Sequence, residues 1–431
     1  MMEHKFFKSI AYLIILSIIT TVIWYFRLEH IGMPIYGGII FALLLIEKNS
    51  ITILPFLLNM LFMISKTKAE WSMDSIPGYL YVIPVLLLIG FIINIIRFKP
   101  KFFQGMLLLP LMLMFAGMLL SMLNMEIIDI NYLFYIMVGL FYLFIYFFFR
   151  SSMTGDNLQF LIRLFAILGV MISVQVLLYY LHVDDVVYAL EHKRIDLGWG
   201  LSNFIATYLL MFIPAMFYFV KKYKFHVFWV VLAVLEIVAL LFTLSRGGIL
   251  TFVGILVFLI IYLFHGYENK RKMTLNVISG LIVLAVVVIV KQNYFVTIYE
   301  RLLDRAFDDT GRYEIWLEGI EKFKQNPILG VGLYARVIND NYFSHYHNTI
   351  IHTAVSMGVV GLVALFWQFI NIARVFIKKI NVETSILFIA ILGANIHGLI
   401  DVVYFMPQFM ILFFIVIAAV ENRNKVVLEV K

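Results

Sequence analysis

Long apolar stretches separated by short polar segments constrain the fold of this chain more than any other feature of its sequence. Of the 431 residues, 63% are hydrophobic and 14% are charged, whereas a soluble domain has roughly 45–50% apolar and about 25% charged residues. One soluble core cannot bury this much apolar surface, so a lipid bilayer must be the solvent for most of the chain. The sequence therefore predicts an all-α integral membrane protein.

Fourteen apolar stretches reach or approach the ~20 residues that a spanning helix needs. Two of them, 33–46 and 51–64, are short, so either their bounds extend further or they form a re-entrant hairpin. No internal repeat or low-complexity linker divides the chain, and we predict one polytopic domain over 1–431 with about fourteen transmembrane helices. The fourteen stretches are 10–26, 33–46, 51–64, 79–96, 103–123, 131–149, 158–181, 201–220, 226–245, 247–264, 275–290, 348–373, 384–402 and 404–420.

The distribution of basic residues predicts which helix ends face the cytoplasm. With both termini inside, twenty of the 33 Lys and Arg residues fall in cytoplasmic segments, six in short outer loops and seven in one long outer segment, about 291–347. Short loops decide orientation, so the positive-inside rule favours this arrangement in the cytoplasmic (inner) membrane. The net charge of +7 is then mostly a result of topology and does not indicate a nucleic-acid partner.

The first polar cluster is Thr243-Leu-Ser-Arg-Gly-Gly248, in a tight turn predicted to join two spans on the outer side. An arginine at this depth can form bidentate hydrogen bonds to phosphate. Gly247 and Gly248 allow a sharp turn and the close approach of a ligand. An arginine that extends from a helix end to the interface explains the same pattern without a ligand. Both interpretations of Arg246 are open from the local sequence.

The long outer segment contains Gly311-Arg-Tyr-Glu-Ile-Trp316, followed by Asn326-Pro-Ile-Leu-Gly-Val-Gly332. Four apolar residues recur at helical spacing in this region, and the Asn-Pro pair ends the predicted helix. We predict that their shared face lies on the membrane surface, as in an interfacial helix. The two glycines of Gly330-x-Gly332 are only a weak indication of a dinucleotide-binding site, because such a site would need a preceding strand. The four apolar residues are Tyr313, Trp316, Ile320 and Phe323.

A histidine motif, His345-Tyr-His-Asn348, leads into the next predicted span, which carries His352 one turn in. A histidine at a membrane surface can act as a base near neutral pH, although an ordinary interfacial pair needs no ligand. His347 and His352 are five residues apart, off the i, i+4 face, and no carboxylate completes an obvious metal set. The chain has no cysteine, which excludes zinc–thiolate sites and thiol nucleophiles. We therefore expect no metal ion.

The last candidate is Asn395-Ile-His-Gly-Leu-Ile-Asp401. His397 and Asp401 are four residues apart and are predicted to share one helical face near the outer end of their helix. The carboxylate could orient a histidine or a cation, and a polar clamp between helices is an equally good interpretation. Glu236 lies ten residues before Arg246, about 15 Å deeper, and is expected to pair within the bundle without a chemical role.

The order of these motifs resembles the superfamily of O-antigen ligases and surface-polysaccharide polymerases, which are bacterial integral membrane glycosyltransferases. The resemblance implies a GT-C-like helical bundle with a ligase- or polymerase-like core at 195–420 and variable N-terminal helices at 1–150. One departure is Gly200-Leu-Ser-Asn203, because members often have Asn-Pro-Asn there. The matching motifs are Gly198-x-Gly200-x-x-Asn203, Ser-Arg-Gly at 245–247, Gly-Arg-x-x-x-Trp at 311–316, Asn-Pro-Ile-Leu-Gly-Val-Gly at 326–332 and His-Asn at 347–348.

The resemblance implies that the donor is a glycan on undecaprenyl diphosphate and that the acceptor is a sugar hydroxyl, with transfer at the outer face of the membrane. Arg246 and Arg312 are suited to stabilise the charge that develops on the diphosphate, and His347 is suited to deprotonate the acceptor. No cofactor is implied, and a flippase and a chain-length regulator are the implied protein partners. The implied substrate-binding residues are Arg194, Asn203, Asn348 and Asp401.

Polymerisation of polysaccharide repeat units is the favoured activity, because such polymerases are numerous and variable. A ligase that attaches the glycan to an envelope acceptor is the first alternative. A flippase or other transporter of lipid-linked oligosaccharide belongs to a different class; it would show internal repeats and polar residues at the midplane, which is nearly bare here. A peptidoglycan polymerase and a non-catalytic scaffold of envelope assembly are further alternatives.

Overall fold

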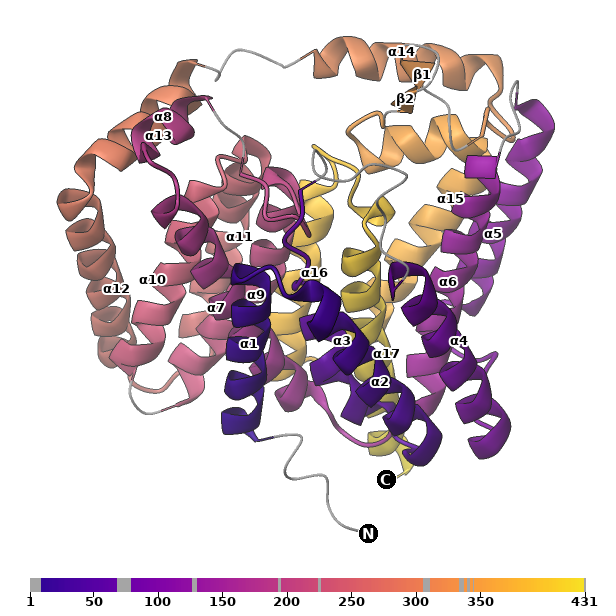
Figure 1. Ribbon diagram of the computed structural model, residues 1–431, viewed down its shortest axis with the longest axis horizontal. Coiled ribbons are helices and arrows are strands. Elements are labelled where there is room, and N and C mark those ends of the chain that lie inside the picture. Colours follow the sequence, from indigo (N-terminus) through magenta and orange to yellow (C-terminus); the bar gives the residue numbers. More distant parts are fainter. Residues whose placement is uncertain are drawn as a thin grey trace. The chain divides into compact units, whose positions relative to one another are not determined.

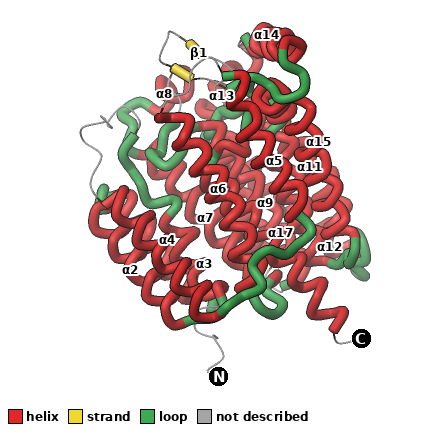
Figure 2. The backbone as a smooth tube through the Cα atoms, turned by 90° about the vertical axis from the view of Figure 1, so that its right-hand side faces the viewer, coloured by secondary structure: helices red, strands yellow, loops and turns green. Residues whose placement is uncertain are grey.

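The computed structural model describes residues 9–67, 79–125, 130–192, 195–223, 226–304, 311–332, 337–338, 342–343 and 345–429. Helices make up most of this part of the chain, and loops join them (Figure 2). Its strands, β1 (Val337–Ile338) and β2 (Tyr342–Phe343), form a short antiparallel pair. The predicted all-α architecture is therefore confirmed.

Six of the described helices are long and apolar enough to cross a membrane by length and composition. Further described apolar helices are shorter, at 10–17 residues. The chain is thus an integral membrane protein, and the number of fourteen spans stays a prediction. The six long helices are α2 (Glu29–Ile46), α7 (Leu158–Leu181), α9 (Ser202–Lys222), α11 (Arg246–Phe264), α12 (Lys270–Val290) and α15 (Thr349–Ile377).

The chain divides into two compact units, each of which gathers three segments of the sequence. Unit 1 comprises Met1–Pro100, Ser152–Leu303 and Ser385–Gly393; unit 2 comprises Lys101–Ser151, Asp304–Thr384 and Ala394–Lys431. Neither unit is continuous along the chain, and the single polytopic domain expected from the sequence stays a prediction.

Figure 1 labels the α-helices. Besides α2, α7, α9, α11 and α12, unit 1 contains α1 (Ile10–Tyr25), η1 (Ser50–Ile53), α3 (Leu54–Met60), α4 (Tyr79–Phe98), α8 (Val186–His192), α10 (His226–Phe242) and α13 (Gln292–Asp304). Besides α15, unit 2 contains α5 (Leu108–Ser121), η4 (Met122–Asn124), α6 (Ile130–Ser152), α14 (Arg312–Gln325), η5 (Val403–Phe405) and α17 (Pro407–Glu429). The middle of α16 (Val382–His397) belongs to unit 1 and its two ends belong to unit 2.

Side chains at the helix starts satisfy backbone N–H groups that have no partner within the helix. Ser245 caps α11 and Asn348 caps α15. Asn381 caps α16 in a reciprocal capping box with Thr384. Such caps matter in a bilayer, because apolar surroundings offer no water to a free N–H group. The positions of these helix starts therefore follow from local sequence.

The predicted span at 51–64 is not one continuous helix. The helical part, η1 and α3, ends at Met60, and the chain continues without helix to Thr67. Ser65 Oγ donates a hydrogen bond to Glu29 Oε2 (2.9 Å), so this segment returns the chain to the end at which α2 begins. Gln175 Nε2 donates to the carbonyl of Phe62 (3.1 Å). Non-helical backbone is tolerated here because buried side chains supply its hydrogen bonds.

The helix α15 is broken at Gly358, whose φ of 60° and ψ of −155° lie outside the helical region. The Asn326–Gly332 segment supplies partners at this break: the Val331 amide donates to Val355 O (2.9 Å), and the Val359 amide donates to Pro327 O (2.8 Å). Residues 359–377 alone give roughly 28 Å of helix at about 1.5 Å per residue, which is enough to cross the hydrocarbon core. The break therefore leaves a full span and allows residues 349–357 a separate direction.

Candidate functional site

His347 and Asp401 form a hydrogen-bonded pair in unit 2. His347 Nδ1 lies 3.2 Å from Asp401 Oδ1, and the exposed fractions of the two side chains are 36% and 11%. An ionised carboxylate can only accept hydrogen bonds, so Nδ1 carries the proton and Nε2 is the unprotonated nitrogen in neutral histidine. Nε2 makes no hydrogen bond to any described residue. The pair therefore presents a basic nitrogen on a partly exposed ring.

The backbone directs the His347 ring toward Asp401. His347 has a φ of 47°, in the left-handed region that non-glycine residues seldom occupy, and such conformations persist only where the surrounding structure fixes them. The next residue supplies that restraint: Asn348 Oδ1 accepts hydrogen bonds from the Ile350 and Ile351 amides, and Asn348 Nδ2 donates to Leu399 O (2.9 Å). Asn348, predicted to bind substrate, thus holds the start of α15 and the turn before Asp401.

Asp401 does not share a helical face with His397, which corrects the expectation from their spacing. The helix α16 ends at His397, and Asp401 follows in a turn. The Asp401 amide donates a hydrogen bond to His397 O (3.0 Å). The Val402 amide donates to Asp401 Oδ1 (2.8 Å). Burial alone would raise the pKa of the Asp401 carboxyl, but the hydrogen bond and charge of His347, followed by the Val402 amide, outweigh it and hold this pKa below its usual range.

Other basic side chains gather around this pair. The rings of His345 and His352 meet edge to face, with centroids 5.1 Å apart. Burial, and to a smaller extent the charge of His347, lowers the pKa of His345 against the opposing influence of Asp401. Arg312, the first residue of α14, lies within electrostatic range of His397. The sequence predicted Arg312, His347 and Asp401 separately; all three belong to unit 2, where His347 and Asp401 are in contact.

The helix α14 packs against the histidine loop, and the contact of its Tyr313 face with the membrane surface stays a prediction. Ile315 and Phe323 pack against the buried Tyr346, and Gly319 allows the close approach, because a Cβ there would lie 2.8 Å from the Tyr346 ring. Tyr313 and Ile320, expected on the same face as Phe323, are exposed. The end of the helix at Gln325, before Asn326-Pro327, agrees with the prediction.

Arg246 occupies the first position of α11, in unit 1. Leu244 reverses the chain with a φ of 58°, and Ser245 Oγ accepts a hydrogen bond from the Gly248 amide (3.2 Å). Ser245 Oγ also donates to Asn203 Oδ1 (2.9 Å), near the start of α9. The side chain of Arg246 is half-buried. An arginine at a helix N-terminus, where the helix dipole is positive, favours an anionic ligand such as phosphate.

Three further sequence predictions concern Arg194, a metal ion and Glu236. Arg194 lies outside the described residues. Within the described residues, no group of three or more His, Asp or Glu side chains is arranged to hold a metal ion. Glu236 is buried in α10 without a hydrogen-bond partner in the described part of the chain, so the expected pairing within the bundle is wrong there.

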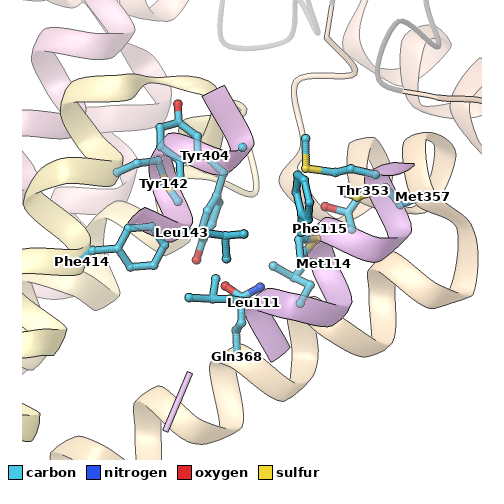
Figure 3. Close-up of a pocket in the computed structure, with 14 residues that line it drawn as sticks. Leu111, Met114, Phe115, Tyr142, Leu143, Thr353, Met357, Gln368, Tyr404 and Phe414 are labelled. Carbon is cyan, nitrogen blue, oxygen red and sulfur yellow. The ribbon is translucent and has the colours of Figure 1, made fainter. Parts of the chain in front are cut away.

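An apolar cavity in unit 2 begins close to the His347–Asp401 pair. Thr349 Oγ1 contacts the carbonyl of Asp401 (3.4 Å), and one turn further along α15 Thr353 lines the cavity. Tyr404, three residues after Asp401, lines it too. Figure 3 shows that α5 and α15 contribute Phe115 and Thr353 on one side, with Tyr404 and Phe414 opposite. Gln368, four turns along α15 from Thr353, marks its far end.

Residues 230–366 match the model of a protein family described as O-antigen ligase. This segment contains Arg246, Arg312 and His347 and four of the five motifs that carried the resemblance, while Gly198-x-Gly200-x-x-Asn203 lies outside it. The predicted resemblance is therefore confirmed over this segment, and it supports a membrane ligase or polymerase of the glycosyltransferase type. No curated protein matches the chain.

The sequence pointed to most of these residues and missed how they connect. Ser245 was part of a recognised motif, but its hydrogen bond to Asn203, 42 residues away, left no signal in the spacing. His345 and His352 were considered only as metal ligands or interfacial residues. Their edge-to-face contact shows that the His345 ring packs against the buried His352.

Proposed function

We propose that this protein transfers a glycan from a polyprenyl diphosphate donor to a sugar hydroxyl at the outer face of the cytoplasmic membrane. The observation that carries the proposal is the His347–Asp401 pair, whose histidine lies in the segment that matches the O-antigen ligase family. Polymerisation of repeat units is the favoured activity, and ligation to an envelope acceptor is the alternative. Both use the same donor and the same chemical step.

In the proposed step, Nε2 of His347 takes the proton of the acceptor hydroxyl while the oxygen attacks the anomeric carbon of the donor. The bond between this carbon and the phosphate oxygen breaks, and its electron pair leaves with the diphosphate. Asp401 stabilises the imidazolium that forms. Direct displacement inverts the configuration at the anomeric carbon. A base in this position contributes typically about 10²–10⁴-fold to a rate.

The leaving diphosphate gains negative charge, and Arg312 is the cation of unit 2 suited to stabilise it. Arg312 lies at the N-terminus of α14, where the helix dipole also favours an anion. The same role for Arg246 stays a prediction from the sequence, supported by its place at the start of α11.

The apolar cavity of unit 2 supports a lipid-linked donor. It runs between helices from Thr353 toward Gln368, and its walls are mostly apolar (Figure 3). A polyprenyl chain is a branched hydrocarbon that such a cavity would accept. We propose that the part of this chain nearest the diphosphate enters here, while the diphosphate stays at the end beside the His347–Asp401 pair.

The test is complementation of a deletion strain, read as a ladder of surface polysaccharide on a gel. We expect His347→Ala and His347→Gln to express normally in the membrane and to restore no long chains. His265→Ala is the matched control, because this exposed histidine at the end of α11 lies outside the cluster. Full rescue by both His347 variants would contradict the proposal.

The same strain distinguishes the two activities. A deletion that loses long chains but keeps single repeat units attached indicates a polymerase, and loss of all attached glycan indicates a ligase. Accumulation of the lipid-linked repeat unit on the cytoplasmic leaflet would instead indicate a flippase.

A further inference from the structure

A second apolar groove lies in unit 1, between α1, α7, α9 and α10. The groove is open to its surroundings, and the empty volume within it, including this opening, is about 1120 Å³. Ile14 and Ile18 of α1, Val170 of α7 and Phe228 of α10 line it, and Ile18 and Phe228 are more than half exposed. In a bilayer these exposed side chains face lipid, so the groove is accessible to an acyl chain from the side.

One end of the groove is polar. Arg163 lines it, is half-buried, and donates through one terminal nitrogen to Tyr223 OH at 3.4 Å. Its Nε is buried and has no hydrogen-bond partner among the described residues. The indole Nε1 of Trp229, which also lines the groove, is likewise buried without a partner in the described part of the chain. Two strong donors therefore lie at this end with unfilled hydrogen-bonding capacity.

The start of α7, the end of α9 and the start of α10 meet at this end of the groove. Arg163 lies near the start of α7, and Trp229 lies near the start of α10. The rings of Phe219, Tyr223 and Trp229 pack together at this level, with the Phe219 and Trp229 centroids 4.6 Å apart. Trp and Tyr are enriched where a helix leaves the hydrocarbon core, so this cluster marks the level of lipid head groups. The positive-inside pattern predicts that this end faces the cytoplasm.

We propose that this groove binds one anionic phospholipid of the cytoplasmic leaflet. Its phosphate accepts hydrogen bonds from Arg163 and from the indole of Trp229, and one acyl chain lies along α1 and α7. A guanidinium group is expensive to keep in apolar surroundings without an anion, and it matches phosphate oxygens in a bidentate geometry. Basic pockets between helices on the cytoplasmic side are known to bind anionic head groups.

This lipid is not the glycan donor. The groove and all of the residues argued for it belong to unit 1, and its polar end lies at the predicted cytoplasmic ends of the helices. The proposed donor cavity belongs to unit 2 and begins at the predicted outer ends. The proposal therefore does not depend on glycosyl transfer.

The test is native mass spectrometry of the full-length protein in a mild detergent, with phosphatidylglycerol and phosphatidylcholine of matched acyl chains. We expect the wild type to retain phosphatidylglycerol about five- to tenfold better than phosphatidylcholine, as for one strong charge-assisted contact. Arg163→Gln should lose this preference, and Val170→Phe, which fills the groove, should reduce retention of both lipids. Arg271→Gln is the matched control, because Arg271 is an exposed basic residue at the start of α12.

Equal retention of phosphatidylglycerol by the wild type and Arg163→Gln would overturn the proposed head-group contact. Unchanged retention by Val170→Phe would overturn the placement of the acyl chain. Size-exclusion elution and the melting temperature show whether each variant is folded. If Arg163→Gln does not fold, Trp229→Phe tests the same head group, since it removes only the indole N–H. Because both lipids carry the phosphate that the indole contacts, we expect about a twofold loss of retention of each from this weaker change, and no loss would contradict the proposal.

Discussion

The two units hold their predicted functional residues in different ways. In unit 1, the turn before Arg246 is fixed by Ser245, which caps α11 and contacts Asn203 on α9. In unit 2, the loop before α15 and the turn after α16 meet at the hydrogen bond between His347 and Asp401. A turn held by one cap responds locally to mutation, whereas a cluster assembled from distant segments fails when any of the segments shifts.

The largest expected effects come from the two arginines, one in each unit. If both stabilise the leaving diphosphate, Arg246→Ala and Arg312→Ala should each lower the transfer rate about 10²–10³-fold, as loss of one transition-state donor does. Transfer from a lipid-linked donor by membranes containing matched amounts of each variant measures this. Arg271→Ala serves as the control. Normal transfer by Arg246→Ala would restrict the chemistry to unit 2.

The glycines that support each region should differ in their tolerance of a side chain. At Gly330, φ is 71° and a Cβ would lie 2.5 Å from the Met357 amide nitrogen. Gly330→Ala should therefore destabilise unit 2 by at least about 2 kcal/mol, because left-handed strain and a backbone clash add. The melting temperature in detergent measures the loss.

Gly254→Ala is the matched control for that substitution. Gly254 lies within α11, and a Cβ there would meet nothing within 4 Å. Alanine should leave the stability unchanged or raise it by up to about 1 kcal/mol, since it favours a helix over glycine. Equal melting temperatures for the two variants would mean that the Asn326–Gly332 segment does not support the break in α15.

Asp401→Asn tests whether unit 2 depends on the orientation of His347. The variant keeps the shape but loses the charge that stabilises the imidazolium, so transfer should fall about 10- to 100-fold, the worth of one hydrogen bond to a charged group. The rate should fall without a large change in the donor concentration needed for half-saturation. An unchanged rate would mean that His347 does not need Asp401 to catalyse the transfer.

Acidic pH should destabilise unit 2 through His345. Burial lowers the pKa of His345 in the folded state, so below pH ~6.5 the unfolded chain binds more protons than the folded one. The free energy of unfolding therefore falls as pH decreases, by at most about 1.4 kcal/mol per pH unit for one group. Asp401 does not contribute in this pH range. Its pKa is lowered in the folded state, so its contribution to the free energy of unfolding is lost only below pH ~4.

Melting temperatures between pH 7 and pH 5 measure this effect. His345→Gln cannot take up the proton and should show a smaller decrease than the wild type. His265→Gln, at an exposed position, should keep the full decrease. If His345→Gln loses as much stability as the wild type, the acid sensitivity lies elsewhere.

The smallest expected effect is that of Asn203→Ala in unit 1. It removes the hydrogen bond from Ser245 but leaves the cap of α11, so the free energy of unfolding should fall by about 1 kcal/mol. A large loss of transfer with little loss of stability would instead show that Asn203 contacts substrate, as the sequence predicted.

The sequence by itself determined the class of protein, the helical architecture and most of the candidate residues. Apolar content requires a bilayer, and the start of α11 at Ser245 and the end of α14 before Pro327 follow from residues within one helical turn. These are short-range effects, since capping and backbone restriction act between near neighbours in the chain.

Only the tertiary structure decided which of these residues meet. The pairing of His347 with Asp401 joins residues 54 positions apart, and it requires α16 to end at His397 rather than continue. Gly330 and Gly332 gave only a weak signal in the sequence. They belong to a segment that hydrogen-bonds to α15 next to its break at Gly358, and this partner is distant in the sequence. Spacing along one helix cannot predict such contacts, because their energy depends on how distant segments pack and which polar groups remain to be satisfied.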